Sequence, residues 1–227
     1  MNKKLIVTID GPAGSGKSTT ARLVATKLGY TYIDSGAMYR AVTLFAIENG
    51  LNQEFDKLID ILPTLSIRLV STDGDTQVFL NDIDISANIR TPEVSELVSE
   101  ISQIHEVRIE LLRKQREMGI QGGVVMEGRD IGSAVFPEAE AKFYLVASPD
   151  RRTERRVLEY KERGIEVSFD EVKENLLKRD YIDSHRATNP LVKPEGAIEI
   201  DTSELAIEDQ VELIVKAVND KSAEGTV

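Results

Sequence analysis

The chain has 227 residues, of which 41% are apolar, and its formal net charge is −11 at pH 7. This length and apolar content suit one large α/β domain. The negative charge argues against a general nucleic-acid surface, which needs a basic face to contact many phosphates. Cysteine is absent, and no apolar run approaches the roughly 18 residues that span a bilayer. We therefore expect a cytoplasmic protein with no membrane or nucleic-acid partner.

The first elements expected along the chain are a strand, a glycine loop and a helix within residues 5–20, LIVTIDGPAGSGKSTT. Residues 11–18 fit the pattern G-x-x-x-x-G-K-[ST] without a mismatch. Such a loop can wrap consecutive backbone N–H groups around a phosphate at a helix N-terminus. The residues that we assign to the phosphates of ATP are Gly11, Pro12, Ala13, Gly14, Ser15, Gly16, Lys17, Ser18 and Thr19.

Two side chains of this loop have specific expected roles. Lys17 would bridge the two outermost phosphates, and we expect it to face solvent when no phosphate is bound. The hydroxyl of Ser18 is suited to complete the shell of a Mg²⁺ ion that keeps its other waters. An ordinary glycine turn is the alternative, but all four defining positions and both flanking elements are present. The sequence therefore predicts a protein that binds a nucleoside triphosphate.

The segment that follows contains a second candidate anion site. Gly29 ends the helix, residues 30–33 form a short strand, and residues 34–36 open another helix. Arg40 lies within the first two turns of that helix. A lone helical arginine is ordinarily a solvated charge, so this position alone leaves both interpretations open.

Residues 65–89 depart from the strand-helix rhythm and predict a small antiparallel insert. Alternating apolar residues flank an Asp73-Gly74 turn, which is a hairpin signal. Thr91-Pro92-Glu93 then starts a helical region whose apolar stripe runs to about residue 118. A break near His105 would divide this region into two helices.

Residues 124–132 repeat the pattern of a buried strand followed by a turn. Glu127, Arg129 and Asp130 then lie at the carboxyl end of that strand, where open α/β sheets bind ligands. Another buried strand is expected over residues 142–147. Residues 197–200 and 205–218 are expected to form the last strand and helix, with residues 221–227 frayed.

A basic helix is expected to begin near residue 148. Its arginines at 151, 152, 155 and 156 form i,i+4 pairs and so predict one shared face, although a solvated face of ion pairs is an equal alternative. A further helix over residues 168–179 starts with a Ser168/Glu171 capping box. With only His105 and His185 in the chain, we expect no histidine metal site.

Six stretches together resemble the bacterial cytidylate kinase family across essentially the whole chain: GPAGSGKST, DSGAMYRAV, the insert, MEGRDIG, ASPDRRTERR and RDYIDSHR. The resemblance implies a P-loop α/β fold with a parallel five-stranded sheet wrapped by helices, a small antiparallel insert and a helical lid. It implies transfer of the γ-phosphate of ATP to CMP or dCMP by a monomer. The single domain would comprise a core (1–62, 91–149 and 180–227), an insert (63–90) and a lid (150–179).

The resemblance also assigns roles to individual side chains. Arg40 and Arg129 match positions that hold the acceptor phosphate, while Arg179 and Asp183 match those at the ribose. Positions that contact or organise the cytosine are matched by Ser35, Ser99, Arg108, Asp130 and Arg186.

Charge stabilisation rather than a general base is the expected mechanism, because phosphoryl transfer spreads negative charge over the transferred group. Glu127 stands where an aspartate is expected in many relatives, and its longer side chain can still serve the shell of Mg²⁺. The catalytic set on this interpretation is Lys17, Arg129, Arg155 and Arg156, with the last two in the lid.

Two other functions share the phosphate loop. A kinase for UMP, AMP or shikimate would phosphorylate a different acceptor, and a non-catalytic ATP-binding module would form no product. A GTPase is disfavoured, since the only Asn-Lys pair is Asn2-Lys3 and no guanine-reading N-K-x-D motif follows.

Overall fold

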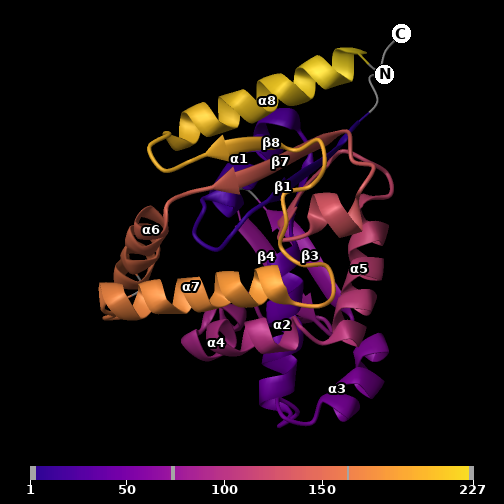
Figure 1. Cartoon of the computed structure of the whole chain (residues 1–227). Helices are drawn as coiled ribbons and strands as arrows, with labels where there is room; N and C mark the ends of the chain where they lie inside the picture. Colours follow the sequence, from indigo (N-terminus) through magenta and orange to yellow (C-terminus); the bar gives the residue numbers. More distant parts are fainter. Residues whose placement is uncertain (1–3, 73–74, 163, 225–227) are drawn as a thin grey trace.

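The computed structural model describes residues 4–72, 75–162 and 164–224. A five-stranded parallel sheet lies at its centre, with the strand order β2-β6-β1-β7-β8 (Figure 1). The predicted α/β class and the parallel five-stranded sheet are confirmed. The strands are β1 (Ile6–Asp10), β2 (Thr31–Asp34), β6 (Val124–Gly128), β7 (Ala141–Val146) and β8 (Ile198–Asp201).

The central strand β1 uses its two faces differently. Val7 and Ile9 are fully buried in a cluster with residues of α1 (Lys17–Leu28) and α8 (Ile207–Glu224), which pack against each other beside the sheet (Figure 1). Because side chains alternate along a strand, Thr8 and Asp10 lie on the opposite face, against the short helix η3 (Ile131–Val135). This second face leads to the candidate site.

A separate apolar cluster joins the helices below the sheet. It includes residues of α2 (Ser35–Glu48), α3 (Phe55–Ile61), η1 (Leu62–Thr64), α4 (Pro92–Ile101) and α5 (His105–Gly119). Thr91 caps α4 by accepting from the backbone N–H of Val94, as the Thr-Pro-Glu signal predicts. The interruption between α4 and α5 confirms the predicted break near His105.

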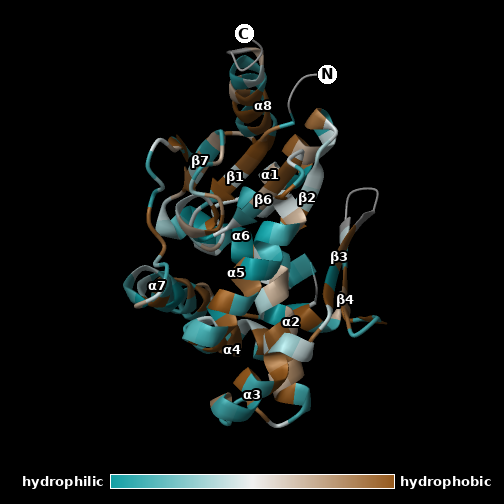
Figure 2. Cartoon of the chain, turned by 90° about the vertical axis from the view of Figure 1, so that its right-hand side faces the viewer, coloured by the Kyte–Doolittle hydropathy of each residue, from teal (hydrophilic) through white to brown (hydrophobic). Residues whose placement is uncertain are grey.

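The insert is antiparallel, as predicted, and consists of β3 (Ile67–Thr72), β4 (Asp75–Leu80) and β5 (Ile83–Asp84), followed by η2 (Asn88–Arg90). The predicted turn at residues 73–74 lies outside the described residues. Val78, Leu80 and Ile89 are buried in the same cluster as the core face of α2. The hairpin therefore stands beside α2 and packs on it (Figure 2).

Two helices that pack against each other follow β7 in the chain: α6 (Pro149–Glu162) and α7 (Phe169–His185). The predicted capping box at Ser168 and Glu171 is present. The predicted end of α7 at residue 179 is wrong, because its charged residues find partners on other segments and do not break the helix. The last helix likewise runs to Glu224 and not to 218, with Val218 still buried. No helix within the described ranges is long and apolar enough to cross a membrane.

Candidate active site

The predicted phosphate loop joins β1 to α1. Gly16 has a left-handed φ of 85° and caps α1 without a side-chain hydrogen bond, so the first N–H groups of the helix remain available to an anion. Gly11 approaches β7 so closely that a Cβ there would lie 2.1 Å from the carbonyl oxygen of Leu145. The loop thus has the geometry of a phosphate cradle.

Lys17 does not face solvent, contrary to the expectation from sequence. Its side chain is 8% exposed, and Nζ donates to the carbonyl of Pro12 at 3.1 Å and lies 3.9 Å from Oε2 of Glu127. Burial, and after it the charge of Arg129, lower the pKa of Lys17 to about 7 against the pull of Glu127. The lysine is folded into its own loop, and a bound phosphate would favour its charged form.

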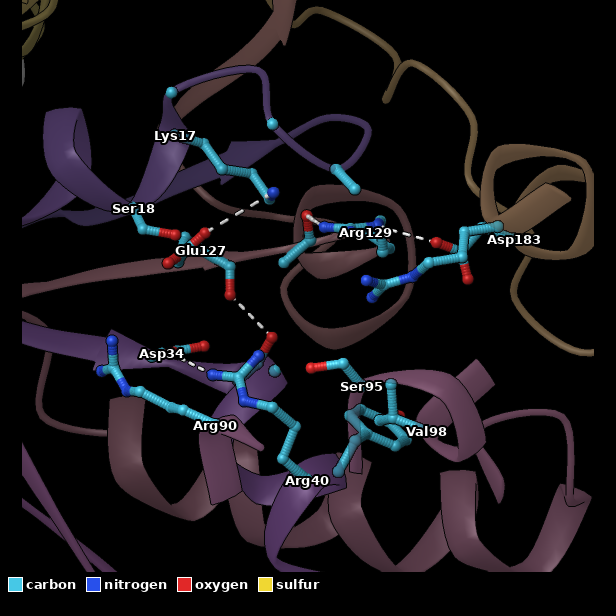
Figure 3. Close-up of a pocket in the computed structure, with 18 of the residues that line it drawn as sticks. Lys17, Ser18, Asp34, Arg40, Arg90, Ser95, Val98, Glu127, Arg129 and Asp183 are labelled. Carbon is cyan, nitrogen blue, oxygen red and sulfur yellow. Dashed lines mark hydrogen bonds and ion pairs between the residues drawn. The ribbon is translucent and has the colours of Figure 1, made fainter. Parts of the chain in front are cut away.

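Glu127 lies opposite the loop, at the end of β6. The hydroxyl of Tyr32 donates to its Oε1 at 2.8 Å, while Ser35 donates to its backbone carbonyl at 2.6 Å. The close-up of the cleft shows Glu127 next to Ser18 (Figure 3). The carboxylate of Glu127 and the hydroxyl of Ser18 are hard oxygen donors. They fit Mg²⁺, which takes one or two protein oxygens together with phosphates and water. Among the described residues no group of three or more His, Cys, Asp or Glu side chains could hold a metal alone.

One continuous cleft of about 820 Å³ extends from the phosphate loop to α5 and α7 (Figure 3). Ten lysine and arginine side chains line it against six Asp and Glu side chains, so it is locally positive in a protein with a net charge of −11. Every predicted acceptor and lid residue lines this cleft. Of the predicted loop residues, Gly11, Pro12 and Ser15 contribute to the loop without lining the cleft.

Arg40 is brought to this cleft by the start of α2. Asp34 caps α2 by accepting from the N–H of Ala37 at 3.0 Å, and its other oxygen accepts from Arg40 at 2.7 Å. Burial raises the pKa of Asp34, but Arg40 and the capping N–H outweigh it and lower this pKa below its usual value. Because Asp34 stays ionised, it fixes the guanidinium of Arg40 at the cleft.

The far end of the cleft contains a chain of buried ion pairs. Asp130 accepts from Arg108, and from Arg186 at 3.3 Å. Asp183 accepts from Arg186 at 3.5 Å and from Arg129 at 2.9 Å. We call these five side chains the acceptor network. Its members hold one another in fixed positions through charge-assisted hydrogen bonds.

Three further predicted residues border this network. Ser99 lies on α4 and is buried, and Ser35 lies at the start of α2. Arg179 lies on α7, and its Nε has no hydrogen-bond partner among the described residues. Burial, and after it the charges of Arg129 and Arg156, lower the pKa of Arg179 to about 10. An anion between these three arginines would relieve their mutual repulsion.

The four arginines of α6 do not act as one face. Arg152 is buried and donates to the phosphate-loop carbonyl of Ala13 at 3.1 Å and to Asp180 of α7 at 2.6 Å. Arg155 also reaches the loop, through the carbonyl of Gly14 at 3.4 Å. Arg151 and Arg156 pair with glutamates on their own helix, at 2.7 Å each. Arg152 and Arg155 therefore anchor α6 to the loop. Arg151 also donates to the carbonyl of Ser203 at 3.0 Å, whereas the ion pair of Arg156 lies within its own helix.

Several cleft residues were missed from the sequence. Arg90 closes the insert and lies beside Asp34 and Arg40, while Ser95 and Val98 of α4 line the opposite wall (Figure 3). The guanidinium of Arg108 lies over the ring of Tyr39, with Cζ of Arg108 5.3 Å from the ring centre. Nothing in the spacing distinguishes these residues from ordinary surface or core positions, so only the tertiary arrangement identifies them.

Neither histidine lies in the cleft lining. His105 contacts the hydroxyl of Thr188 at 3.1 Å, and His185 stacks on Tyr181 with ring centres 4.1 Å apart. Both are surface contacts.

A phosphate cradle at the end of a parallel sheet, facing an arginine-rich subsite within the same cleft, defines the class of P-loop kinases. Residues 7–220 match the family model of cytidylate kinase. The chain is 46% identical to cytidylate kinase of Bacillus pumilus over 220 residues, which cover 96% of this chain and 98% of that protein. It is also 46% identical to cytidylate kinase of Fusobacterium nucleatum over 214 residues, or 94% and 97% of the two chains. The chain belongs to the cytidylate kinase family, as the resemblance in its motifs predicts.

Similarity to solved structures concerns the fold alone. A gluconokinase from Sinorhizobium meliloti 1021 superimposes with a TM-score of 0.50 at 13% identity, covering 99% of this chain and 96% of that one. This agrees with the P-loop kinase architecture.

Proposed function

We propose that this enzyme transfers the γ-phosphoryl group of ATP to CMP or dCMP, giving ADP and CDP or dCDP. The observation that carries the proposal is the single cleft in which Lys17 of the phosphate loop faces Arg40 and Arg129. The names of its relatives, cytidylate kinases, support the choice of acceptor. A cleft made from one chain also supports a monomer, and the lack of cysteine is in keeping with the cytoplasm.

On the donor side, the backbone N–H groups of the loop residues 11–19, other than Pro12, which has none, bind the ATP phosphates, and Lys17 bridges the outer two. Ser18 and Glu127 would hold Mg²⁺ directly or through water, and the ion would neutralise charge on those phosphates. Phosphate binding draws Nζ of Lys17 from the carbonyl of Pro12, its partner in the free loop. The loss of that weak internal contact is small beside the gain of a charged one.

On the acceptor side, Arg40 and Arg129 bind the phosphate of CMP, and Arg179 and Asp183 contact the ribose. Arg40 and Arg129 are each held by a carboxylate, at 2.7 and 2.9 Å. Their guanidinium groups retain further N–H donors for a phosphate. The acceptor oxygen is thereby brought in line with the γ-phosphorus without a general base.

For the cytosine ring, Asp130 accepts from the N4 amino group and Arg108 donates toward N3 or O2, with Ser35, Ser99 and Arg186 organising the pocket. Both oxygens of Asp130 already accept from arginines, and each retains a further lone pair. A carboxylate held in this way is a fixed acceptor. It favours an amino donor over the O4 oxygen of uracil.

During transfer, Lys17, Arg129, Arg155 and Arg156 stabilise the charge that spreads over the phosphoryl oxygens. Arg156 pairs with Glu159, whose side chain is 50% exposed, and such surface pairs contribute little. It can therefore exchange this partner for a phosphate as the lid closes. Closure also excludes water, which would otherwise hydrolyse ATP.

The test is a coupled assay at fixed ATP with CMP, dCMP, UMP and AMP. We expect CMP and dCMP to be phosphorylated with the highest kcat/KM. A higher kcat/KM for UMP or AMP would show that the acceptor proposed here is wrong. If no acceptor gives a product, the protein is a non-catalytic ATP-binding module.

A further inference from the structure

A buried carboxylate on the central strand has no part in the proposed mechanism. Asp10 is the last residue of β1, directly before the phosphate loop, and it is 0% exposed. Its Oδ1 accepts from the backbone N–H of Ile131 at 2.8 Å, and Oδ2 accepts from that of Gly132 at 2.7 Å. Asp10 thus joins β1 to the turn that follows β6.

That turn contains two residues of the acceptor site. Arg129 and Asp130 immediately precede Ile131 and Gly132, whose N–H groups donate to Asp10. These groups lie at the start of η3, where helical N–H groups have no partner within their own helix. Asp10 satisfies them both, so one side chain of β1 helps to fix the position of the turn.

The turn also packs on β1 without spare room. A Cβ added at Gly132 would lie 2.7 Å from Oγ1 of Thr8 and 3.3 Å from Oδ2 of Asp10. A small displacement of this turn would move Arg129 and Asp130 directly. Their partners Asp183 and Arg186 come from the α7 side, so β1 and α7 hold the turn from two sides.

The arrangement is unfavourable for the carboxylate itself. Among the described residues no basic side chain lies within 4.0 Å of Asp10. Burial raises its pKa to about 7, against the lowering effect of the two N–H groups. The charge of Lys17 offsets this rise only in part, so a buried carboxylate here is unfavourable for stability, and its contribution is the fixing of the turn.

We propose that Asp10 is a positioning residue that holds Arg129 and Asp130 in register with the phosphate loop. This inference rests on the proposed function, since it concerns how the same site selects and places its acceptor. Loss of the Asp10 contacts should therefore affect CMP and its discrimination from UMP, and should leave ATP binding unaffected.

The test compares Asp10→Asn with Thr8→Val. Asparagine keeps the size of aspartate but turns one acceptor into an NH₂ donor, which faces a backbone N–H. Thr8 is a matched control because it lies on the same strand face, is 0% exposed and contacts the same turn, while its hydroxyl has no partner among the described residues. Steady-state KM and kcat are measured for ATP, CMP and UMP in both variants.

We expect Asp10→Asn to raise KM for CMP about tenfold and to narrow the CMP/UMP ratio of kcat/KM, with KM for ATP within about twofold of wild type. Thr8→Val should change none of these. A purely structural role would lower the fraction of folded enzyme, and hence apparent kcat, without changing KM.

A double variant tests whether Asp10 acts through Asp130. In the Asp130→Asn background, Asp10→Asn should change the CMP/UMP ratio by less than about twofold, because the group that reads the base is already altered. An equal effect in both backgrounds would contradict action through Asp130.

If Asp10→Asn does not fold, Gly132→Ala disturbs the same contact from the other side and should give the same rise in KM for CMP. Unchanged KM for CMP and an unchanged base ratio in a folded variant would overturn the inference. The proposed function is judged separately, because it fails only if wild type itself does not phosphorylate CMP or dCMP.

Discussion

The acceptor network and the outer face of α6 are both rich in arginine, but they are built differently. In the network, Arg108 is 1% exposed and Arg186 is 7% exposed, and each is paired with a carboxylate from a distant segment. On α6, Arg151 and Arg156 pair with glutamates three residues away at the surface, and Arg151 also contacts the exposed Glu204. The first arrangement preorganises a pocket, and the second leaves charges free to exchange partners.

This difference separates recognition from transfer. Buried pairs lose much free energy when one partner is removed, because the other charge remains desolvated. Exposed pairs contribute roughly 0 to 1 kcal/mol and are readily replaced by a phosphate. Substitutions in the network should therefore alter which acceptor is used, and those on the outer face of α6 should alter how fast transfer occurs.

The largest effect is expected from Lys17→Ala, which removes a charge that lies outside both regions, at the transferring group. We predict that kcat falls by about 10²-fold or more. The fold should persist, since burial of the charged lysine is unfavourable and its Nζ makes one hydrogen bond, to Pro12, and one distant ion pair, with Glu127. Steady-state kinetics and circular dichroism on the same sample check both points. Turnover near the wild-type rate would rule out the assigned cradle.

The comparison is sharpened by two neighbouring arginines of α6. Arg152→Ala should lower the free energy of unfolding by about 3 kcal/mol, because it breaks a buried pair with Asp180 and frees the carbonyl of Ala13. Arg156→Ala should change stability by less than about 0.5 kcal/mol but reduce kcat more than it weakens CMP binding. Urea unfolding and kinetics of both variants check this. Equal stability losses would mean that Arg156 is also an anchor.

The secondary structure was largely predictable because its signals are local. The glycine loop, the Thr91 and Ser168 caps and the hairpin insert each depend on a few neighbouring residues. The parallel five-stranded sheet was implied by the family resemblance, and the strand-helix rhythm of the chain agrees with it. The predicted residues of the acceptor network also meet in one cleft, because they lie after the end of β6, in the first turn of α5 or at the end of α7, all of which border that cleft.

What could not be predicted depends on contacts between distant segments. The i,i+4 pattern of α6 treats Arg151 and Arg152 alike, yet only Arg152 meets Ala13 and Asp180. The charged stretch of α7 suggested an early helix end, but its acids are neutralised by arginines that lie 28 and 54 positions earlier in the chain. Lys17 was expected to face solvent, because no local sequence signal predicts its hydrogen bond to the carbonyl of Pro12. That contact arises from the curvature of the loop.

A smaller effect concerns protons at the phosphate loop. The pKa of Lys17 is lowered to about 7 in the free enzyme, so above pH 7 this lysine is mostly neutral. Phosphate favours its charged form, so ATP binding should take up a proton at pH 8 and almost none at pH 6. Calorimetry in two buffers of different ionisation enthalpy measures this uptake. It should disappear in Lys17→Ala, and an uptake that persists there would assign it to another group.

The smallest effect is expected at the ribose. Asp183→Ala should lower kcat/KM for CMP and dCMP together, because Arg129 and Arg186 lose their shared partner. It should also reduce any preference for CMP by about fivefold, the value of one hydrogen bond to the 2′-hydroxyl. The ratio of kcat/KM for the two acceptors isolates that bond. An unchanged ratio would show that Asp183 does not read the 2′ position.

The central claim is that the acceptor network recognises cytosine, and the CMP/UMP ratio of kcat/KM in Asp130→Asn tests it most directly. Asparagine keeps the shape, removes the charge and adds an NH₂ donor that can meet O4 of uracil. We predict that CMP activity falls at least about tenfold and that the ratio shrinks, with KM for ATP unaltered. General damage to Arg108 and Arg186 would lower both acceptors equally. A ratio preserved at the wild-type value would contradict the account.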